Sequence, residues 1–225
     1  MRYGTLACAV CALAIALGMF AVSGSLRAQV AAATPSTVAD IRAELEAMVA
    51  SDQENRKLIQ AAKTADERKA LWDKQLPIDA TNQKRVEAII QQVGWPGLSV
   101  YGAKASSAAF LVLQHAPMET MKRHFSLLEK AMEQGELRKE SFALFDDRIR
   151  MNEGRPQRYG SQLTRDEKTD KLVLWPIEDE ANVDVRRAKM GMPPLAQYAK
   201  FFGLDYALPA SKTEAIQSNA PSEKK

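Results

Sequence analysis

His115 is the side chain of this sequence best suited to proton transfer near neutral pH. Imidazole changes its charge in that range, and a carboxylate that orients the ring makes it a general acid or base. The apolar segment 106–116 predicts a buried helix that ends near His115, where the helix dipole favours the protonated ring. Asp147 or Asp52 would supply the orienting carboxylate. We therefore predict His115 and Asp147 as the candidate catalytic residues of a metal-independent hydrolase or lyase.

Polar side chains that the pattern places in or beside the apolar core form a second candidate set, suited to binding a ligand. Arginine can grip a carboxylate or phosphate through two parallel N–H bonds, and amides and a phenol add donors and acceptors. The candidate ligand-binding residues are Asp52, Arg56, Gln114, Arg148, Gln157, Tyr159, Gln162 and Arg187. The competing interpretation is structural, because Asp52 and Arg56 can pair along a helix and buried acids commonly pair with arginine.

The sequence lacks the residues that other kinds of catalytic or cofactor site require. Cys8 and Cys11 lie in the apolar N-terminal segment, so a processed chain would contain no thiol. His115 and His124 fall on opposite sides of any continuous helix, and no His-Glu-x-x-His, phosphate-loop, dinucleotide or Gly-x-Ser-x-Gly motif is present. The 31 basic and 28 acidic residues almost balance, which argues against a nucleic-acid partner. We expect no metal and no cofactor.

The N-terminus resembles an export signal. Arg2 precedes an apolar run from Leu6 to Val22, and small residues follow, as in a secretory signal peptide. Cleavage after Ala28 or after Ala33 fits the sequence. An uncleaved anchor remains the alternative, and then the only membrane contact, because the run is barely long enough to span a bilayer. We expect an exported protein, periplasmic or secreted.

The remainder predicts a mainly α-helical single domain with one short β-hairpin. Apolar residues recur every three or four positions in several segments, which is typical of amphipathic helices. The expected helices span residues 36–62, 81–93, 106–116, 117–135, 139–152, 183–189 and 195–202. Residues 63–80 contain Pro77 and predict a short helix followed by a loop. We expect a signal peptide over 1–28, a linker over 29–35, the domain over 36–206 and a disordered tail over 207–225.

The predicted hairpin carries three of the candidate residues. Two short segments, 157–163 and 171–175, flank a polar turn. Gln157 and Tyr159 would share one strand face, and a bulge at Gly160 would bring Gln162 onto the same face. On the preceding helix, Asp147 lies among apolar residues and therefore needs a partner.

These residues also carry a family resemblance. The chain resembles an uncharacterised bacterial family, number 6624 in the series of domains of unknown function, over roughly residues 40–200. The matching pieces are Met48, Asp52-Gln53-x-x-Arg56, Gly94-Trp95-Pro96, Gln114-His115-Ala116, Asp147-Arg148, Gln157-x-Tyr159-Gly160-x-Gln162, Pro176-Ile177, Asp179, Val183-Asp184-x-Arg186-Arg187, Gly191 and Tyr198. Ser161 replaces an expected threonine, and Pro117 an expected acid. The resemblance implies a mostly helical domain and no known activity.

Three functions therefore remain open. The first is a binding or interaction module of the cell envelope that holds a small polar ligand or a peptide. The second is the enzyme that uses His115 as general acid or base. The third is a structural domain whose polar cluster only fixes the hairpin to the helices.

Overall fold

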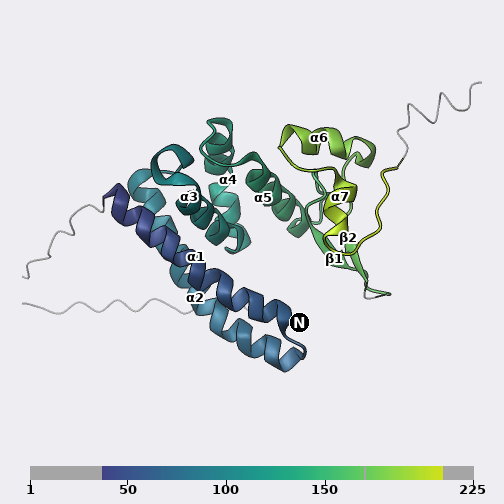
Figure 1. Cartoon of the computed structure of the whole chain (residues 1–225), viewed down its shortest axis with the longest axis horizontal. Coiled ribbons are helices and arrows are strands. Elements are labelled where there is room, and N and C mark those ends of the chain that lie inside the picture. The colour runs from purple at the N-terminus through teal and green to yellow at the C-terminus, as the bar shows by residue number, and fades with distance from the viewer. Residues whose placement is uncertain (1–36, 170, 210–225) are drawn as a thin grey trace, which may run out of the picture. The chain divides into compact units, whose positions relative to one another are not determined.

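The computed structural model describes residues 37–169 and 171–209, apart from the side chains of residues 50–52. These residues belong to one structural unit, which begins at Ser36. They form seven α-helices, one 3-10 turn and one two-stranded sheet (Figure 1), so the fold is mainly α-helical, as predicted. The predicted signal peptide and linker and residues 210–225 of the predicted tail lie outside the described residues.

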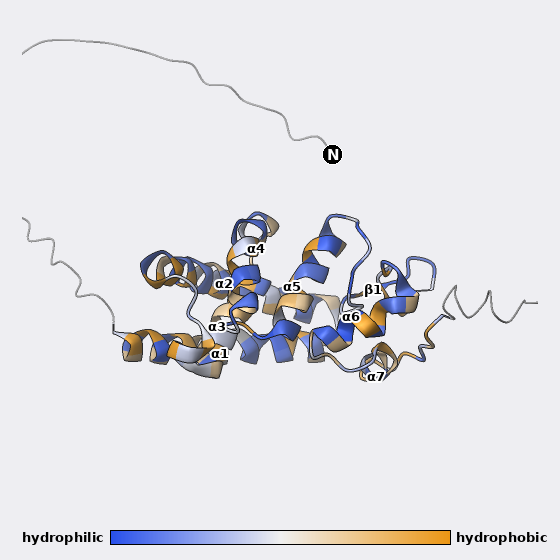
Figure 2. Cartoon of the chain, turned by 90° about the horizontal axis from the view of Figure 1, so that it is seen from above, coloured by the Kyte–Doolittle hydropathy of each residue, from blue (hydrophilic) through white to orange (hydrophobic). Residues whose placement is uncertain are grey.

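The first two helices pack side by side (Figure 1). Helix α1 (Val38–Ala61) and helix α2 (Ala65–Val93) each begin with a capping box, in which a threonine and an acid three residues later satisfy each other's backbone N–H groups. The caps are Thr37 with Asp40 and Thr64 with Glu67. Hydrophilic and hydrophobic residues alternate along both helices (Figure 2), as their amphipathic pattern predicts.

The prediction of a loop before residue 81 is wrong. Helix α2 runs unbroken through Pro77. A proline inside a helix removes one N–H donor and crowds the carbonyl four residues earlier, here that of Asp73. The cap at Thr64 and the packing against α1 outweigh that loss.

Helices α3 (Leu98–Gln114), α4 (Met118–Glu133) and α5 (Lys139–Asn152) complete the core. The segment from Ser106 to Gln114 is largely buried, as its apolar composition predicts. Gly102 has a φ of 81° and introduces a kink before that segment. The core combines these helices with α1 and α2 and includes Leu45, Ile89, Leu113, Leu128 and Phe145.

The C-terminal part is less regular than predicted. Strands β1 (Leu163–Arg165) and β2 (Leu172–Leu174) form an antiparallel hairpin in which Leu163 faces Leu174. The 3-10 turn η1 (Glu180–Asn182) and helices α6 (Val183–Lys189) and α7 (Leu195–Lys200) follow. Residues 157–162 form a loop with one isolated bridge rather than the predicted strand. Among the described residues, no helix combines the length and apolar character that crossing a bilayer requires.

Candidate functional site

The predicted polar residues fall into two groups in the structure. Asp147, Gln157, Tyr159, Gln162 and Arg187 gather around the loop 157–162. Arg56, Gln114, His115 and Arg148 line a cavity among the helices. Asp52 lies in α1, but its side chain is outside the described part of the structure. The sequence could not separate these groups, because both consist of polar residues beside the core.

The first group, which we call the clasp, is built on the carboxylate of Asp147 in α5. This residue is completely buried. Its carboxylate accepts hydrogen bonds from the backbone N–H groups of Arg158 (2.6 Å), Tyr159 (3.1 Å) and Ser161 (3.0 Å). The Ser161 hydroxyl donates a further bond at 2.9 Å. The predicted need of Asp147 for a partner is therefore met by a loop whose N–H groups it satisfies.

Gln157 closes the same loop from the other side. Its Oε1 accepts from the Gln162 N–H at 2.7 Å, and its Nε2 donates to the carbonyls of Gln162 and Trp175 at 3.0 and 2.7 Å. Gly160 turns the chain with a φ of 69°, and an added Cβ there would lie 2.8 Å from Leu195. The predicted row of Gln157, Tyr159 and Gln162 on one strand face is wrong. Residues 157–162 do not form a strand, because most of their backbone N–H groups donate to the side chains of Asp147 and Gln157 instead of to a neighbouring strand.

Arg187 of α6 completes the clasp. Its guanidinium is buried and donates to the carbonyls of Tyr159 and Pro193, both at 2.6 Å. It also lies over the ring of Tyr198, 4.8 Å from the centroid. These bonds hold α6 and the segment before α7 against the loop, so Arg187 has a structural role. Arg187 does not line the cavity that holds the other group.

The predicted pairing of His115 with Asp147 is not found. The groups that bond the carboxylate of Asp147 all belong to residues 158–161. His115 is the C-cap residue of α3, as predicted, and lines the cavity, whereas Asp147 does not. A general-base mechanism that requires Asp147 to orient His115 therefore lacks its geometry in this structure.

The cavity has a volume of about 350 Å³. Helices α1, α2, α4 and α5, the C-terminal end of α3 and the turn between α3 and α4 supply its walls. The lining residues are Arg56, Trp72, Leu76, Asp79, Gln114, His115, Ala116, Met118, Met121, Arg148, Met151 and Asn152. This volume lies within the usual range for small-molecule sites.

One cation of the cavity is neutralised. Arg56 forms an ion pair with Asp79 at 2.6 Å, and Gln75 donates a second bond to the same carboxylate oxygen at 2.7 Å. The guanidinium of Arg56 also lies 5.8 Å from the ring centroid of Trp72. Asp79 and Trp72 were not among the predicted site residues, because residues 63–80 were expected to form only a short helix followed by a loop.

Arg148 is different. Among the residues that the structure describes, its guanidinium has no hydrogen-bond acceptor and no ion-pair partner, and Arg56 is the charge that acts on it. Burial, and then the charge of Arg56, lower the pKa of the Arg148 guanidinium. The side-chain amide of Gln114, in the same wall, likewise makes no hydrogen bond to a described residue. The cavity thus presents donors that lack an acceptor.

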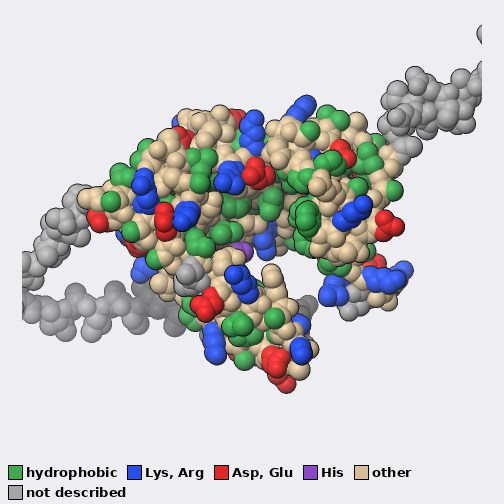
Figure 3. Space-filling model, in the orientation of Figure 1, with side chains coloured by type: hydrophobic (Ala, Val, Ile, Leu, Met, Phe, Trp, Pro, Cys, Tyr) green, Lys and Arg blue, Asp and Glu red, His purple; other side chains and the backbone are tan. Residues whose placement is uncertain are grey.

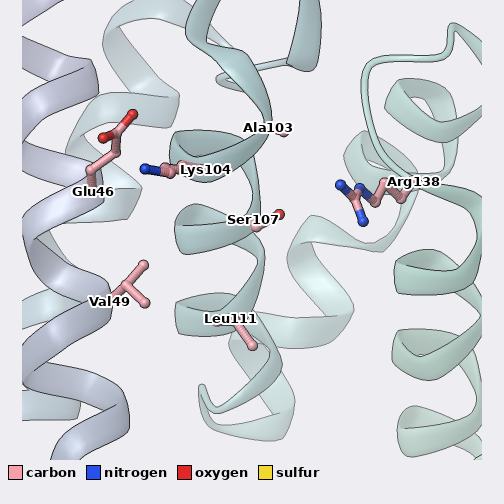
Figure 4. Close-up of a pocket in the computed structure, with 7 residues that line it drawn as sticks. All are labelled: Glu46, Val49, Ala103, Lys104, Ser107, Leu111 and Arg138. Carbon is pink, nitrogen blue, oxygen red and sulfur yellow. The ribbon is translucent and has the colours of Figure 1, made fainter.

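Another cavity lacks this feature. It measures about 450 Å³ and lies between α1 and α3, with Arg138 at its side (Figure 4). Its charged side chains, Glu46, Lys104 and Arg138, are exposed, so water already satisfies them. Val49, Ala103 and Leu111 supply its apolar lining, and Ser107 adds a hydroxyl.

A further cavity, of about 420 Å³, contains the buried carboxylate of Asp146. Arg150 and Arg158 approach this carboxylate at 3.4 and 3.6 Å, so its charge is partly balanced. Among the described residues, no group of three or more His, Cys, Asp or Glu side chains is placed to hold a metal ion.

The pKa of Asp146 leads to a pH prediction. Burial raises the pKa of this carboxyl, and the two arginines oppose that effect. The folded protein therefore holds this proton to a higher pH than the unfolded chain, whose aspartates titrate at about pH 4. The corresponding stability is present below the unfolded pKa and is lost as the pH rises through the folded pKa. We expect Asp146→Asn to gain stability relative to the wild type over this range in urea denaturation, and parallel pH curves would contradict this.

The described residues thus form a mainly helical fold with a cavity, open to solvent, that is lined by two arginines, one histidine and one carboxylate. The chain belongs to the DUF6624 family, described as a family of unknown function, which matches residues 39–211. No curated protein and no solved structure matches the chain.

Proposed function

We propose that this protein is a binding module that holds a small anionic ligand in the cavity lined by Arg148. The observation that carries the proposal is a half-buried guanidinium that lines a cavity and has no acceptor among the described residues. Partial removal of a charge from water without a partner is unfavourable. A carboxylate or phosphate would relieve this cost through the two parallel bonds that arginine forms with such groups.

A neighbouring group supports an anion at this position. The amide of Gln114 lines the same cavity and can donate a further hydrogen bond. By contrast, basic and acidic side chains intermingle over the face drawn in Figure 3. The proposal therefore rests on an interior site rather than on the charge of the surface.

The test is an anion-dependent rise in melting temperature. The probes are acetate, inorganic phosphate, 3-phenylpropionate and phenyl phosphate, applied at constant ionic strength to the wild type and to Arg148→Met. A ligand that binds only the folded state stabilises it by mass action. At least one probe should raise the melting temperature of the wild type and leave that of Arg148→Met unchanged. Equal shifts in both proteins would contradict the proposal.

We further propose that the module is exported to the cell envelope. The support is the order of Arg2, the apolar run from Leu6 to Val22 and the small residues that follow. Intact mass and N-terminal sequencing of the protein from its own cell should find a chain that begins at Gln29 or Thr34. A full-length chain in the soluble cytoplasmic fraction would contradict this.

A further inference from the structure

We propose that the ligand is a monocarboxylate that carries a compact apolar group, with the carboxylate at Arg148 and the apolar group between Trp72 and the methionines of the cavity. This inference rests on the proposed function and specifies its ligand. It draws on two features of the cavity, the balance of its charges and the composition of its walls.

The charges favour a single negative charge on the ligand. The cavity contains two arginines and one carboxylate, and that carboxylate, Asp79, is paired with Arg56 at 2.6 Å. Arg148 alone among the described cations of this cavity has no partner. One carboxylate would neutralise it. The dianion of a phosphate monoester would leave an excess negative charge close to Asp79, and burial makes such an excess costly.

The walls favour an apolar group on the same ligand. Trp72 and Leu76 of α2 line the cavity and are 39% and 59% exposed, so large apolar surfaces stand at its opening. Met118, Met121 and Met151 supply further apolar surface. Methionine is flexible and polarisable, and it packs well against aromatic or branched groups of varied shape. Neither water nor a free inorganic anion would bury apolar surface against these side chains.

The two features face the same space, because all these side chains line one cavity of about 350 Å³. That volume is at the lower end of the range for small-molecule sites, so it suits a compact ligand rather than a long acyl chain or a folded peptide. The amide of Gln114 can donate to a carboxylate oxygen as well, which would fix the orientation of the carboxylate plane.

Isothermal titration calorimetry with four matched probes tests the inference. 3-Phenylpropionate has both features, acetate lacks the apolar group, 3-phenylpropanol lacks the charge, and phenyl phosphate carries a second charge near pH 8. We expect 3-phenylpropionate to bind at least about tenfold more tightly than each of the other three. Arg148→Met should abolish this binding, and Trp72→Ala should weaken it several-fold. Arg138→Met, which removes an exposed arginine of the other cavity, is the control and should bind as the wild type does.

The outcomes separate this inference from the proposed function. Tighter binding of phenyl phosphate, lost in Arg148→Met, would overturn the monocarboxylate and leave an anion site. Equal affinity for acetate and 3-phenylpropionate would overturn the apolar half. Binding of 3-phenylpropanol as tight as that of 3-phenylpropionate would overturn the carboxylate. If no anionic probe binds in an Arg148-dependent way, both the inference and the proposed function fail.

Discussion

Replacing Arg148 by methionine is expected to make the ligand-free protein more stable while it removes anion binding. The guanidinium is half-buried and has no acceptor among the described residues, so the folded state carries part of its desolvation cost without a compensating protein bond. Methionine keeps the side-chain length and removes the charge. We expect the free energy of unfolding in urea to rise by about 1 kcal/mol. A ligand site that is less stable than it could be is a common consequence of selection for function.

Arg150→Met is the matched control on the same helix. Arg150 lies two residues further along α5 and is paired with Glu178 at 2.7 Å, and it donates to the carbonyl of Pro156 at 3.2 Å. Its loss should therefore destabilise the protein, opposite in sign to the loss of Arg148. If both variants lose stability to the same degree, Arg148 has a structural partner and is not a ligand anchor.

Asp147→Ala should produce the largest loss of stability. The substitution leaves three backbone N–H groups and one hydroxyl in the buried clasp without an acceptor. Each unsatisfied buried donor costs roughly 1–3 kcal/mol, and the costs are not strictly additive. We expect a decrease of at least about 3 kcal/mol in the free energy of unfolding. Asp147→Asn keeps one acceptor oxygen and should fall between the two proteins.

Asp166→Ala is the control for this prediction. Asp166 also accepts two backbone N–H bonds, from Lys168 and Thr169, and one hydroxyl bond, but it lies in the exposed turn of the hairpin. Water replaces its bonds when it is removed, so the effect should be small. If Asp147→Ala and Asp166→Ala lower the free energy of unfolding by similar amounts, burial of the clasp does not account for its contribution to stability.

The helices were predictable because their signals are local. Caps such as Thr37 and the apolar spacing of Ile41, Leu45 and Met48 act within a few residues. The exceptions depend on distant contacts. The proline at position 77 is tolerated because α2 packs against α1, and the loop 157–162 replaces a strand because Asp147 takes up its N–H groups. Neither effect can be seen in the neighbouring sequence.

The candidate site was predictable in part for the same reason. Arg56, Gln114, His115 and Arg148 were all among the candidate residues, and they do share one cavity. Their separation from Gln157, Tyr159 and Arg187 depends on the tertiary fold. Asp79 was missed together with the helix that carries it, although it determines which arginine is neutralised.

The most direct measurement is the melting temperature of the wild type and Arg148→Met, taken side by side over rising concentrations of 3-phenylpropionate at constant ionic strength. If Arg148 is a buried cation held for an anion, Arg148→Met melts higher without the ligand and does not respond to it. The wild type starts lower and rises with concentration. A variant that starts lower than the wild type, or rises in parallel with it, would contradict an anion site at Arg148.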